Sequence, residues 1–349
     1  MKTASIWSRL ADVAGLAATP LTPSHYVGLL RPLSASHQLK ARVEGVCEEA
    51  PGVATLTLRP GRGWRGHLPG QFVRVGVEID GRIATRTYSI SSAPGRTDGC
   101  VTITVKAQGR VSNVLVRDTA PGTYLTLGPA EGDFVLPANT GPLLFVTGGS
   151  GITPIASMLR TYAAHGAMPD IAHVHYARTA EDVIFGDELR QLAAAHPSYR
   201  LHVILTSQNA RRFDREGLAA RVPDWKMRET FACGPQSLLD ACAFTHALHV
   251  ERFTAALAPA PENATGGRVR FRTSRVSAIA DGRTPLLRIA EDAGVSAPHG
   301  CRMGICHSCD VTLTAGCVRD LRTGERIDEP GSRIQTCVCA AAGDVDLAL

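Results

Sequence analysis

The sequence HGCRMGICHSC, residues 299–309, carries three cysteines in the arrangement Cys-x4-Cys-x2-Cys. A fourth cysteine, Cys337, stands later in the chain at the end of the segment IQTC. Two glycines, Gly300 and Gly304, free the first loop to adopt unusual backbone conformations and to point N–H groups at the sulfur atoms. Four thiolates gathered by one loop and one later segment would form a metal-binding set. The candidate ligands are Cys301, Cys306 and Cys309, with Cys337 or the neighbouring Cys339 as the fourth.

This cysteine spacing favours a [2Fe–2S] cluster over a zinc ion. Two irons and two sulfides need four thiolates, and the plant-type spacing takes three of them from a single loop. Zinc sites usually combine two close pairs of ligands, whereas the fourth cysteine here stands alone. His307 is interpreted as a surface residue of the loop, and Cys317 as an ordinary thiol. Spacing alone does not separate Cys337 from Cys339 as the fourth ligand, because residues two apart on a strand lie on the same face.

The composition is that of an ordinary globular chain, with 349 residues of which 44% are hydrophobic, and it predicts two or three domains. The formal net charge of +5 is too small for this length to indicate nucleic-acid binding. Of the 10 cysteines, only Cys47 and Cys100 precede Cys233. Such an uneven distribution argues against a disulfide scaffold and favours metal binding in a reducing compartment. No apolar run is long enough to predict a transmembrane helix.

Residues 1–38 are expected to form an N-terminal extension that contains one short amphipathic helix. Its apolar residues at helical spacing are Ile6, Leu10, Val13 and Ala17. This apolar face is expected to pack on the protein itself, and contact with a membrane or a membrane-bound partner is the alternative. Asp12 interrupts the apolar stretch, so the segment is not expected to be an export signal.

Residues 39–138 show short apolar and polar alternations divided by glycine and proline turns. The predicted strands are 54–58, 72–77, 84–90, 101–105 and 124–127. Several short strands at this spacing are typical of an antiparallel β-barrel or sandwich, and we predict a barrel.

The rest of the chain is predicted to form two further domains joined by a linker. Residues 139–254 alternate strands and helices, which indicates a parallel α/β layer. Its predicted strands are 143–147, 171–176, 201–205 and 230–232, and its helices 155–162, 187–195 and 236–248. Residues 255–267, rich in Ala, Pro and Gly, are the linker. Residues 268–349 are expected to be a small α+β domain with a hairpin at 268–279, a helix at 286–293 and strands at 311–313 and 344–349.

The stretch RTYS, residues 86–89, ends a predicted strand of the first domain. Arginine binds phosphate, tyrosine can cover a flavin ring and serine can hydrogen-bond a ring nitrogen, so this stretch suits a flavin. PGQ at 69–71 precedes it, and KAQGRVS at 106–112 follows as a loop that enters a helix, where phosphate can bind. The candidate flavin-binding residues are Arg86, Thr87, Tyr88, Ser89, Val105, Lys106, Gly109, Val111 and Ser112.

The stretch VTGGSGITP, residues 146–154, follows a predicted strand and opens a helix in the second domain. Its glycines permit close approach of a ligand to the backbone, although it is not the usual Gly-x-Gly-x-x-Gly motif and a tight structural turn is the alternative. CGP at 233–235 ends a later strand. Arginines after other strands, at 178, 211 and 212, can hold a 2′-phosphate, which favours NADPH over NADH. The candidate nucleotide-binding residues are Gly148, Gly149, Gly151, Thr153, Arg178, Arg212, Gly234 and Pro235.

These motifs resemble two known families. RTYS, GGSGITP and CGP are similar to the flavin and nucleotide loops of the ferredoxin–NADP reductase superfamily, and HGCRMGICHSC with IQTC resembles plant-type ferredoxin modules. The resemblance implies FAD rather than FMN, a β-grasp fold for the third domain and Cys337 as the fourth cluster ligand. It implies that Arg86, Tyr88 and Ser89 meet the flavin phosphates, ring and ring N5. It also implies two catalytic residues, Ser89 at the flavin and Cys233 beside the nicotinamide.

The domain order flavin, nicotinamide, cluster, together with the extension and the basic loop GRGWRGH at 61–67, resembles the reductase partners of bacterial membrane fatty-acyl desaturases. This implies an NAD(P)H-dependent flavin and iron–sulfur oxidoreductase that passes electrons to a separate protein, with a desaturase favoured. The reductase of an aromatic-ring or alkane hydroxylase system is the alternative, and a redox-sensing regulatory protein is the alternative from another class. We expect a cytoplasmic monomer, with peripheral contact at the inner face of the membrane, that binds no nucleic acid.

Overall fold

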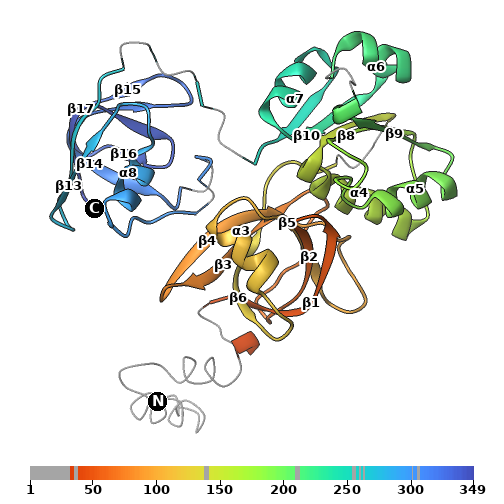
Figure 1. Cartoon of the computed structure of the whole chain (residues 1–349), viewed down its shortest axis with the longest axis horizontal. Coiled ribbons are helices and arrows are strands. Elements are labelled where there is room, and N and C mark those ends of the chain that lie inside the picture. Colours follow the sequence, from red (N-terminus) through yellow and green to blue (C-terminus); the bar gives the residue numbers. More distant parts are fainter. Residues whose placement is uncertain are drawn as a thin grey trace, which may run out of the picture. The chain divides into compact units, whose positions relative to one another are not determined.

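The structure is a computed structural model, and its contacts divide it into two compact units (Figure 1). The first is Met1–Ala84 with Tyr88–Glu251, and the second is Arg252–Leu349 with the short stretch Thr85–Thr87. It describes residues 32–34, 38–136, 141–208, 213–253, 257–258, 261, 264–300, 302–304 and 307–349. The predicted N-terminal helix and several linker residues lie outside this described part. None of the helices within the described residues is long and apolar enough to cross a membrane.

The first unit begins with a six-stranded sheet in the order β4-β3-β6-β1-β2-β5. Its strands are β1 (Lys40–Ala50), β2 (Val53–Pro60), β3 (Phe72–Ile79), β4 (Arg82–Ser89), β5 (Val101–Lys106) and β6 (Tyr124–Glu131). An antiparallel bridge between Ile90, just after β4, and Ile103 in β5 joins the two ends of this order. The sheet therefore closes into a barrel whose interior is filled by alternate apolar residues such as Val43, Leu56 and Val73, and the predicted barrel is confirmed.

The same unit continues with a parallel sheet in the order β11-β10-β7-β8-β9. Its strands are β7 (Leu143–Gly148), β8 (Ile171–Ala177), β9 (Tyr199–Leu205), β10 (Glu229–Cys233) and β11 (Leu248–Glu251). The connecting helices are α4 (Ile152–His165), α5 (Gly186–Ala195), α6 (Arg215–Arg221) and α7 (Gln236–Ala241).

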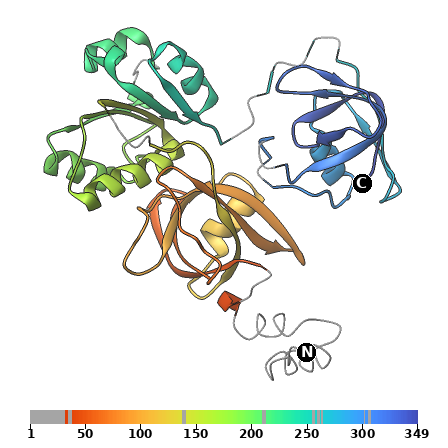
Figure 2. The ribbon, with the colours of Figure 1, turned by 180° about the vertical axis from the view of Figure 1, so that it is seen from behind.

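Helices cover both faces of this parallel sheet (Figure 2). Leu143 and Phe145 of β7 belong to the core cluster that contains residues of α4 and α5. Leu144 and Val146, which alternate with them, belong to the cluster that contains residues of α6 and α7. The continuous apolar run of β7 thus reflects burial on both faces, as parallel strands require, and the predicted α/β layer is confirmed.

The predicted helix at 236–248 is wrong in its second half. The helix α7 ends at Ala241, a 3-10 turn follows at Cys242–Phe244, and Leu248 begins β11. Thr245 closes the turn, since its Oγ1 donates a hydrogen bond to the Cys242 carbonyl oxygen at 2.8 Å. Ala247 then adopts a left-handed φ of 41°, so the chain cannot continue as a helix.

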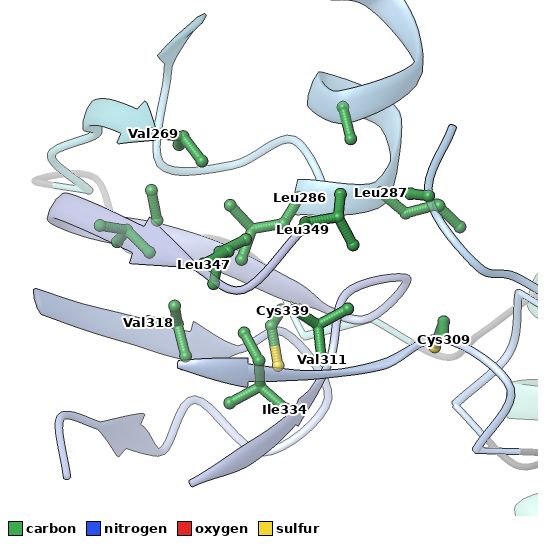
Figure 3. Close-up of a cluster of buried hydrophobic side chains, with 14 of the residues drawn as sticks. Val269, Leu286, Leu287, Cys309, Val311, Val318, Ile334, Cys339, Leu347 and Leu349 are labelled. Atoms are coloured by element: carbon green, nitrogen blue, oxygen red, sulfur yellow. The ribbon is translucent and has the colours of Figure 1, made fainter. Parts of the chain in front are cut away.

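The second unit is a mixed sheet in the order β13-β12-β17-β14-β15, with β16 paired to β14. Its elements are β12 (Gly267–Phe271), β13 (Val276–Ala280), α8 (Leu286–Asp292), β14 (Asp310–Asp320), β15 (Arg326–Ile327), β16 (Arg333–Gln335) and β17 (Cys339–Leu347). The antiparallel hairpin β12–β13 and helix α8 match the prediction, and β17 pairs parallel to β12. Helix α8 packs Leu286 and Leu287 into a core with Val269, Leu347 and Val311, which completes the expected β-grasp arrangement (Figure 3).

Candidate functional site

The loop after β7 and the loop after β10 touch each other at the carboxyl edge of the parallel sheet. Thr147 and Cys233 are register partners on these two neighbouring strands. A Cβ atom on Gly151 would lie 2.0 Å from the Cys233 carbonyl oxygen, and one on Gly148 would lie 2.9 Å from Pro235 Cδ. Only glycine fits at these contacts. The two predicted nucleotide motifs therefore form one surface, at the place where open α/β sheets bind ligands.

A cavity of about 660 Å³ opens at this surface, a volume suited to a small-molecule ligand. It is lined on the barrel side by Val53 and Lys106. Residues from the parallel sheet that line it include four predicted nucleotide-binding positions, Gly148, Gly149, Arg178 and Pro235. The barrel and the parallel sheet thus share one ligand cavity, with cationic side chains from both.

In this cavity Arg178 forms an ion pair with Asp182. The Arg178 side chain is 73% exposed, and its Nη2 lies 2.9 Å from Asp182 Oδ1. The hydrogen bond from Arg178 lowers the pKa of the Asp182 carboxyl, so the pair is ionised at neutral pH. The other predicted phosphate-binding arginine, Arg212, lies outside the described residues.

The RTYS stretch lies on β4, with Tyr88 packed against the barrel core and Ser89 buried. Just beyond it, the Ser91 carbonyl oxygen accepts a hydrogen bond from Arg160 Nη1 at 2.6 Å, and the Ser92 carbonyl oxygen accepts one from Ser157 Oγ at 2.6 Å. Both donors belong to α4, the helix that starts at the nucleotide loop. The strand with the predicted flavin-binding residues is therefore held directly by the helix of the nucleotide site.

The predicted phosphate loop follows β5, which ends at Val105 and Lys106, and enters a helix of only four residues, α3 (Arg110–Asn113). Ser112 Oγ accepts hydrogen bonds from the backbone N–H groups of Gln108 and Gly109, at 3.0 and 2.9 Å. Its hydroxyl donates to the Gly109 carbonyl oxygen at 3.0 Å. Ser112 therefore shapes the loop itself, while Val111 is buried in the barrel core.

Two of the predicted cluster ligands, Cys309 and Cys337, come together in the second unit. Their Sγ atoms are 3.2 Å apart and both residues are buried. The hydrogen bond with Cys337 lowers the pKa of the Cys309 thiol below its ordinary value, which favours its thiolate. The other two predicted ligands, Cys301 and Cys306, lie outside the described residues. The donor chemistry of this pair fits an iron–sulfur cluster.

Gly304, between the first two predicted ligands in the sequence, lies against the segment that carries Cys337. Gly304 has a left-handed φ of 72°, and a Cβ there would lie 3.0 Å from both methyl carbons of Val338. Cys339 belongs to the same buried core as Cys309 and Cys337, and its side chain lies with Val311 and Ile334 (Figure 3). Burial raises the pKa of Cys339 to about 12, which disfavours its thiolate.

His307 and Cys317 are placed as the sequence predicts. The side chain of His307 is 69% exposed, and its Nδ1 lies 3.3 Å from Asp310 Oδ2. Cys317 is half-buried on β14.

Sequence reasoning missed one acidic residue beside the nucleotide loops. Glu251 ends β11 and is the register partner of Cys233 on β10. Both are buried, and the pKa of the Cys233 thiol is raised well above its ordinary value, first by burial and further by the Glu251 carboxylate. An acidic residue that ends an otherwise apolar strand, as in LHVE, is the sequence signal that could have identified it.

Sequence reasoning also missed a buried chain of hydrogen bonds next to Cys233. Thr147 Oγ1 lies 2.7 Å from His173 Nε2 and 2.7 Å from His175 Nδ1. His173 Nδ1 in turn lies 2.8 Å from the Tyr199 hydroxyl. Burial lowers the pKa of His173 well below its ordinary value and that of His175 to about 4, so both are neutral at physiological pH. Alternate histidines in the apolar strand IAHVHYA are the signal for this chain.

Three protein-family models match consecutive parts of the chain. They are the oxidoreductase FAD-binding domain at residues 53–135, the oxidoreductase NAD-binding domain at 145–243 and the 2Fe-2S iron-sulfur cluster binding domain at 272–342. An NADPH oxidoreductase of Mycobacterium tuberculosis is 46% identical over 351 residues, which cover 97% of this chain and 91% of the relative. The chain belongs to the ferredoxin–NADP reductase superfamily, in the branch that carries a C-terminal [2Fe–2S] domain.

Two further similar proteins are reductases by name. The reductase subunit of glycine betaine monooxygenase of Chromohalobacter salexigens is 32% identical over 291 residues, which cover 71% of this chain and 77% of the relative. The solved structure of phthalate dioxygenase reductase aligns with a TM-score of 0.64 and 25% identity, covering 89% of this chain and 97% of that one.

The family models decide between the cofactors that the sequence left open. The chain is an oxidoreductase that uses FAD, a pyridine nucleotide and a [2Fe–2S] cluster, so the predictions of FAD over FMN and of iron–sulfur over zinc are confirmed. The residues fit these groups, since the strand at 86–89 offers a cation, an aromatic ring and a hydroxyl, and the second unit pairs two buried thiols. The electron acceptor is a separate question.

Proposed function

We propose that this reductase takes electrons from NADPH and delivers them, one at a time, to an oxygen-activating enzyme, specifically a membrane-bound fatty-acyl desaturase. The observation that carries the proposal is the order of FAD, nucleotide and [2Fe–2S] domains in one chain. When bound, FAD supplies the conversion of a two-electron hydride donor into single electrons, and the cluster carries one electron. Two relatives are named as reductase components of monooxygenases.

At the nucleotide cavity, this chain's residues bind and orient the donor. We assign the backbone of Gly148 and Gly149 to the pyrophosphate, because a glycine loop at a strand end lets phosphate approach the backbone. Arg178 binds the adenosine 2′-phosphate, which would select NADPH over NADH. We assign Cys233 and its neighbour Glu251 to the nicotinamide end of the site, and the raised pKa keeps the Cys233 thiol neutral.

At the flavin and cluster sites, the proposed roles follow the chemistry of each side chain. Arg86 and Lys106 bind flavin phosphates, Tyr88 covers the ring and Ser89 donates a hydrogen bond to ring N5. The ligands of the cluster are Cys301, Cys306, Cys309 and Cys337. The contact between the Cys309 and Cys337 sulfurs, and the raised pKa of the Cys339 thiol, support this choice of the fourth ligand.

The proposal of a desaturase as acceptor rests on the resemblance of the extension and of the basic loop at 61–67. In that loop Arg62 and Arg65 are exposed, and Trp64 packs one side against the barrel core. A tryptophan flanked by arginines suits the surface of an anionic membrane. In this proposal the chain acts as a monomer at the inner face of the membrane. The relatives that serve oxygenases make a hydroxylating enzyme the second candidate.

Reconstitution tests the acceptor. The purified reductase, with FAD and cluster bound, is mixed with NADPH and either a fatty-acyl desaturase in phospholipid vesicles or an aromatic-ring oxygenase. We expect double-bond formation coupled to NADPH oxidation, with NADH supporting a lower rate. Product from the oxygenase but not from the desaturase would contradict the proposed acceptor. Failure of NADPH to reduce even cytochrome c over many turnovers would instead favour the sensor function.

A further inference from the structure

We infer that Arg322 is a positioning residue for the [2Fe–2S] cluster, which holds the cysteine loop in place and sets a positive charge beside it. Arg322 follows β14 and connects two segments that are distant in the sequence. The inference depends on the cluster that the chain binds and is independent of the identity of the electron acceptor.

One edge of the Arg322 guanidinium is fixed by Asp320. Its Nε and Nη2 lie 3.1 and 2.7 Å from the two carboxylate oxygens of Asp320. The backbone N–H of Arg322 donates to the same carboxylate at 2.8 Å. The Asp320 side chain is only 12% exposed, so this bidentate pair is shielded from water and holds the arginine in one orientation.

The remaining nitrogen of the guanidinium holds the cysteine loop. Arg322 Nη1 donates a hydrogen bond of 2.7 Å to the carbonyl oxygen of Gly304. Gly304 lies between Cys301 and Cys306 in the sequence, so this bond fixes the loop that carries the first predicted ligands. Next to Arg322, the Leu321 N–H donates to the Val338 carbonyl oxygen at 2.7 Å. The turn at 320–322 therefore holds both cysteine-bearing segments.

Arg322 places a positive charge next to the two cysteine-bearing segments. Asp320 pairs with the Nε and Nη2 edge, and Nη1 carries the side of the delocalised cation that faces Gly304. The pKa of Arg322 is raised by its hydrogen bond with Asp320, by the charge of Asp320 and by the nearby sulfurs of Cys339 and Cys337. A cation near cluster sulfurs stabilises the extra negative charge of the reduced state. Arg322 should therefore raise the reduction potential of the cluster.

A redox titration of the full chain tests this inference. The cluster signal is followed by electron paramagnetic resonance in the wild type and in Arg322→Gln, with iron and sulfide measured per chain. We expect Arg322→Gln to bind the cluster with a more negative midpoint potential and to lose it at a lower temperature. Arg322→Lys, which keeps the charge, should shift the potential less. Arg288→Gln is the matched control, because Arg288 forms an exposed ion pair with Asp292 in the same domain.

The outcomes separate this inference from the proposed function. A fully loaded Arg322→Gln variant with the wild-type potential would overturn the charge role of Arg322. If Arg322→Gln binds no cluster, the Arg322→Lys variant is titrated in its place. A cluster-loaded Arg322→Lys variant with a midpoint potential near the wild-type value supports the inference, and a midpoint potential far below the wild-type value contradicts it. A wild-type chain that holds no cluster would refute the assignment of the reductase itself.

Discussion

The two cysteines of the segment TCVC have the same residue type and different surroundings. Both are buried, but Cys337 Sγ lies 3.2 Å from Cys309 Sγ, whereas the Cys339 side chain lies with Val311 and Ile334 (Figure 3). We predict that Cys337→Ser abolishes stable cluster binding and that Cys339→Ser keeps the cluster. The Cys339 variant should lose about 1–3 kcal/mol of stability, because a hydroxyl is buried without an assured partner. Iron content and the reduced-cluster spectrum of each variant measure the difference, and the reverse pattern would make Cys339 the ligand.

The buried histidines give the parallel sheet a pH dependence with a definite sign. His175 has its pKa lowered from 6.5 to about 4, so the unfolded chain binds a proton in this range and the folded chain does not. Stability is therefore full above pH 6.5 and falls as the pH drops towards 4, by about 1.4 kcal/mol per pH unit for each such histidine. Hydrogen exchange of peptides from β8, corrected for intrinsic rates, should report this slope. His175→Leu should remove the share of the slope that His175 contributes and leave the share of His173, whereas the exposed His246→Gln should leave the slope unchanged. An equal slope in His175→Leu would show that other groups are responsible.

Many of the candidate site residues can be predicted from the sequence, because motifs such as RTYS and the cysteine spacing are short and local. Glu251 and His175 were not predicted, because they lie far from Cys233 in the sequence. Strand pairing in the order β11, β10, β7 and β8 brings both into one row with Cys233 and Thr147. Cys339 could not be separated from Cys337 by spacing, because the distinction depends on the packing of the core around each thiol.

At the scale of elements, the nucleotide site depends on direct packing between the loops after β7 and β10. Gly151 has an ordinary helical φ of −64°, so its substitution is limited by space and not by backbone strain. Gly151→Ala would place a methyl group 2.0 Å from the Cys233 carbonyl oxygen and push the two loops apart. We predict a KM for NADPH that rises about tenfold, equivalent to about 1.4 kcal/mol, with FAD content unchanged. Gly141→Ala, with open space around its Cβ, is the control for steady-state kinetics; unaltered kinetics in Gly151→Ala would show that the loops can move apart freely.

Most strands and helices follow from their periodicity, and the exceptions have physical reasons. The long strand β1 was not predicted, because register shifts between Val43 and Gly45 and between Glu48 and Ala50 interrupt its alternation. The short helix α6 has an N-terminal cap, in which the Asp214 carboxylate accepts a hydrogen bond from the Gly217 N–H at 2.6 Å. With seven residues it is too short for helical periodicity to identify.

At the scale of the whole molecule, the two compact units divide the reaction between them. The first unit carries the FAD and nucleotide domains, and the second carries the [2Fe–2S] domain. We predict that Cys309→Ser removes the cluster and leaves NADPH-dependent ferricyanide reduction close to wild type, because the first unit reacts with small oxidants directly. Reduction of cytochrome c, and of the partner enzyme, should fall to background. Cys317→Ser, at a half-buried cysteine of the same domain that is outside the predicted ligand set, should retain both activities. Cytochrome c reduction that survives in a Cys309→Ser chain shown to lack iron would mean that electrons leave from the flavin, and the domain order would then not describe the electron path.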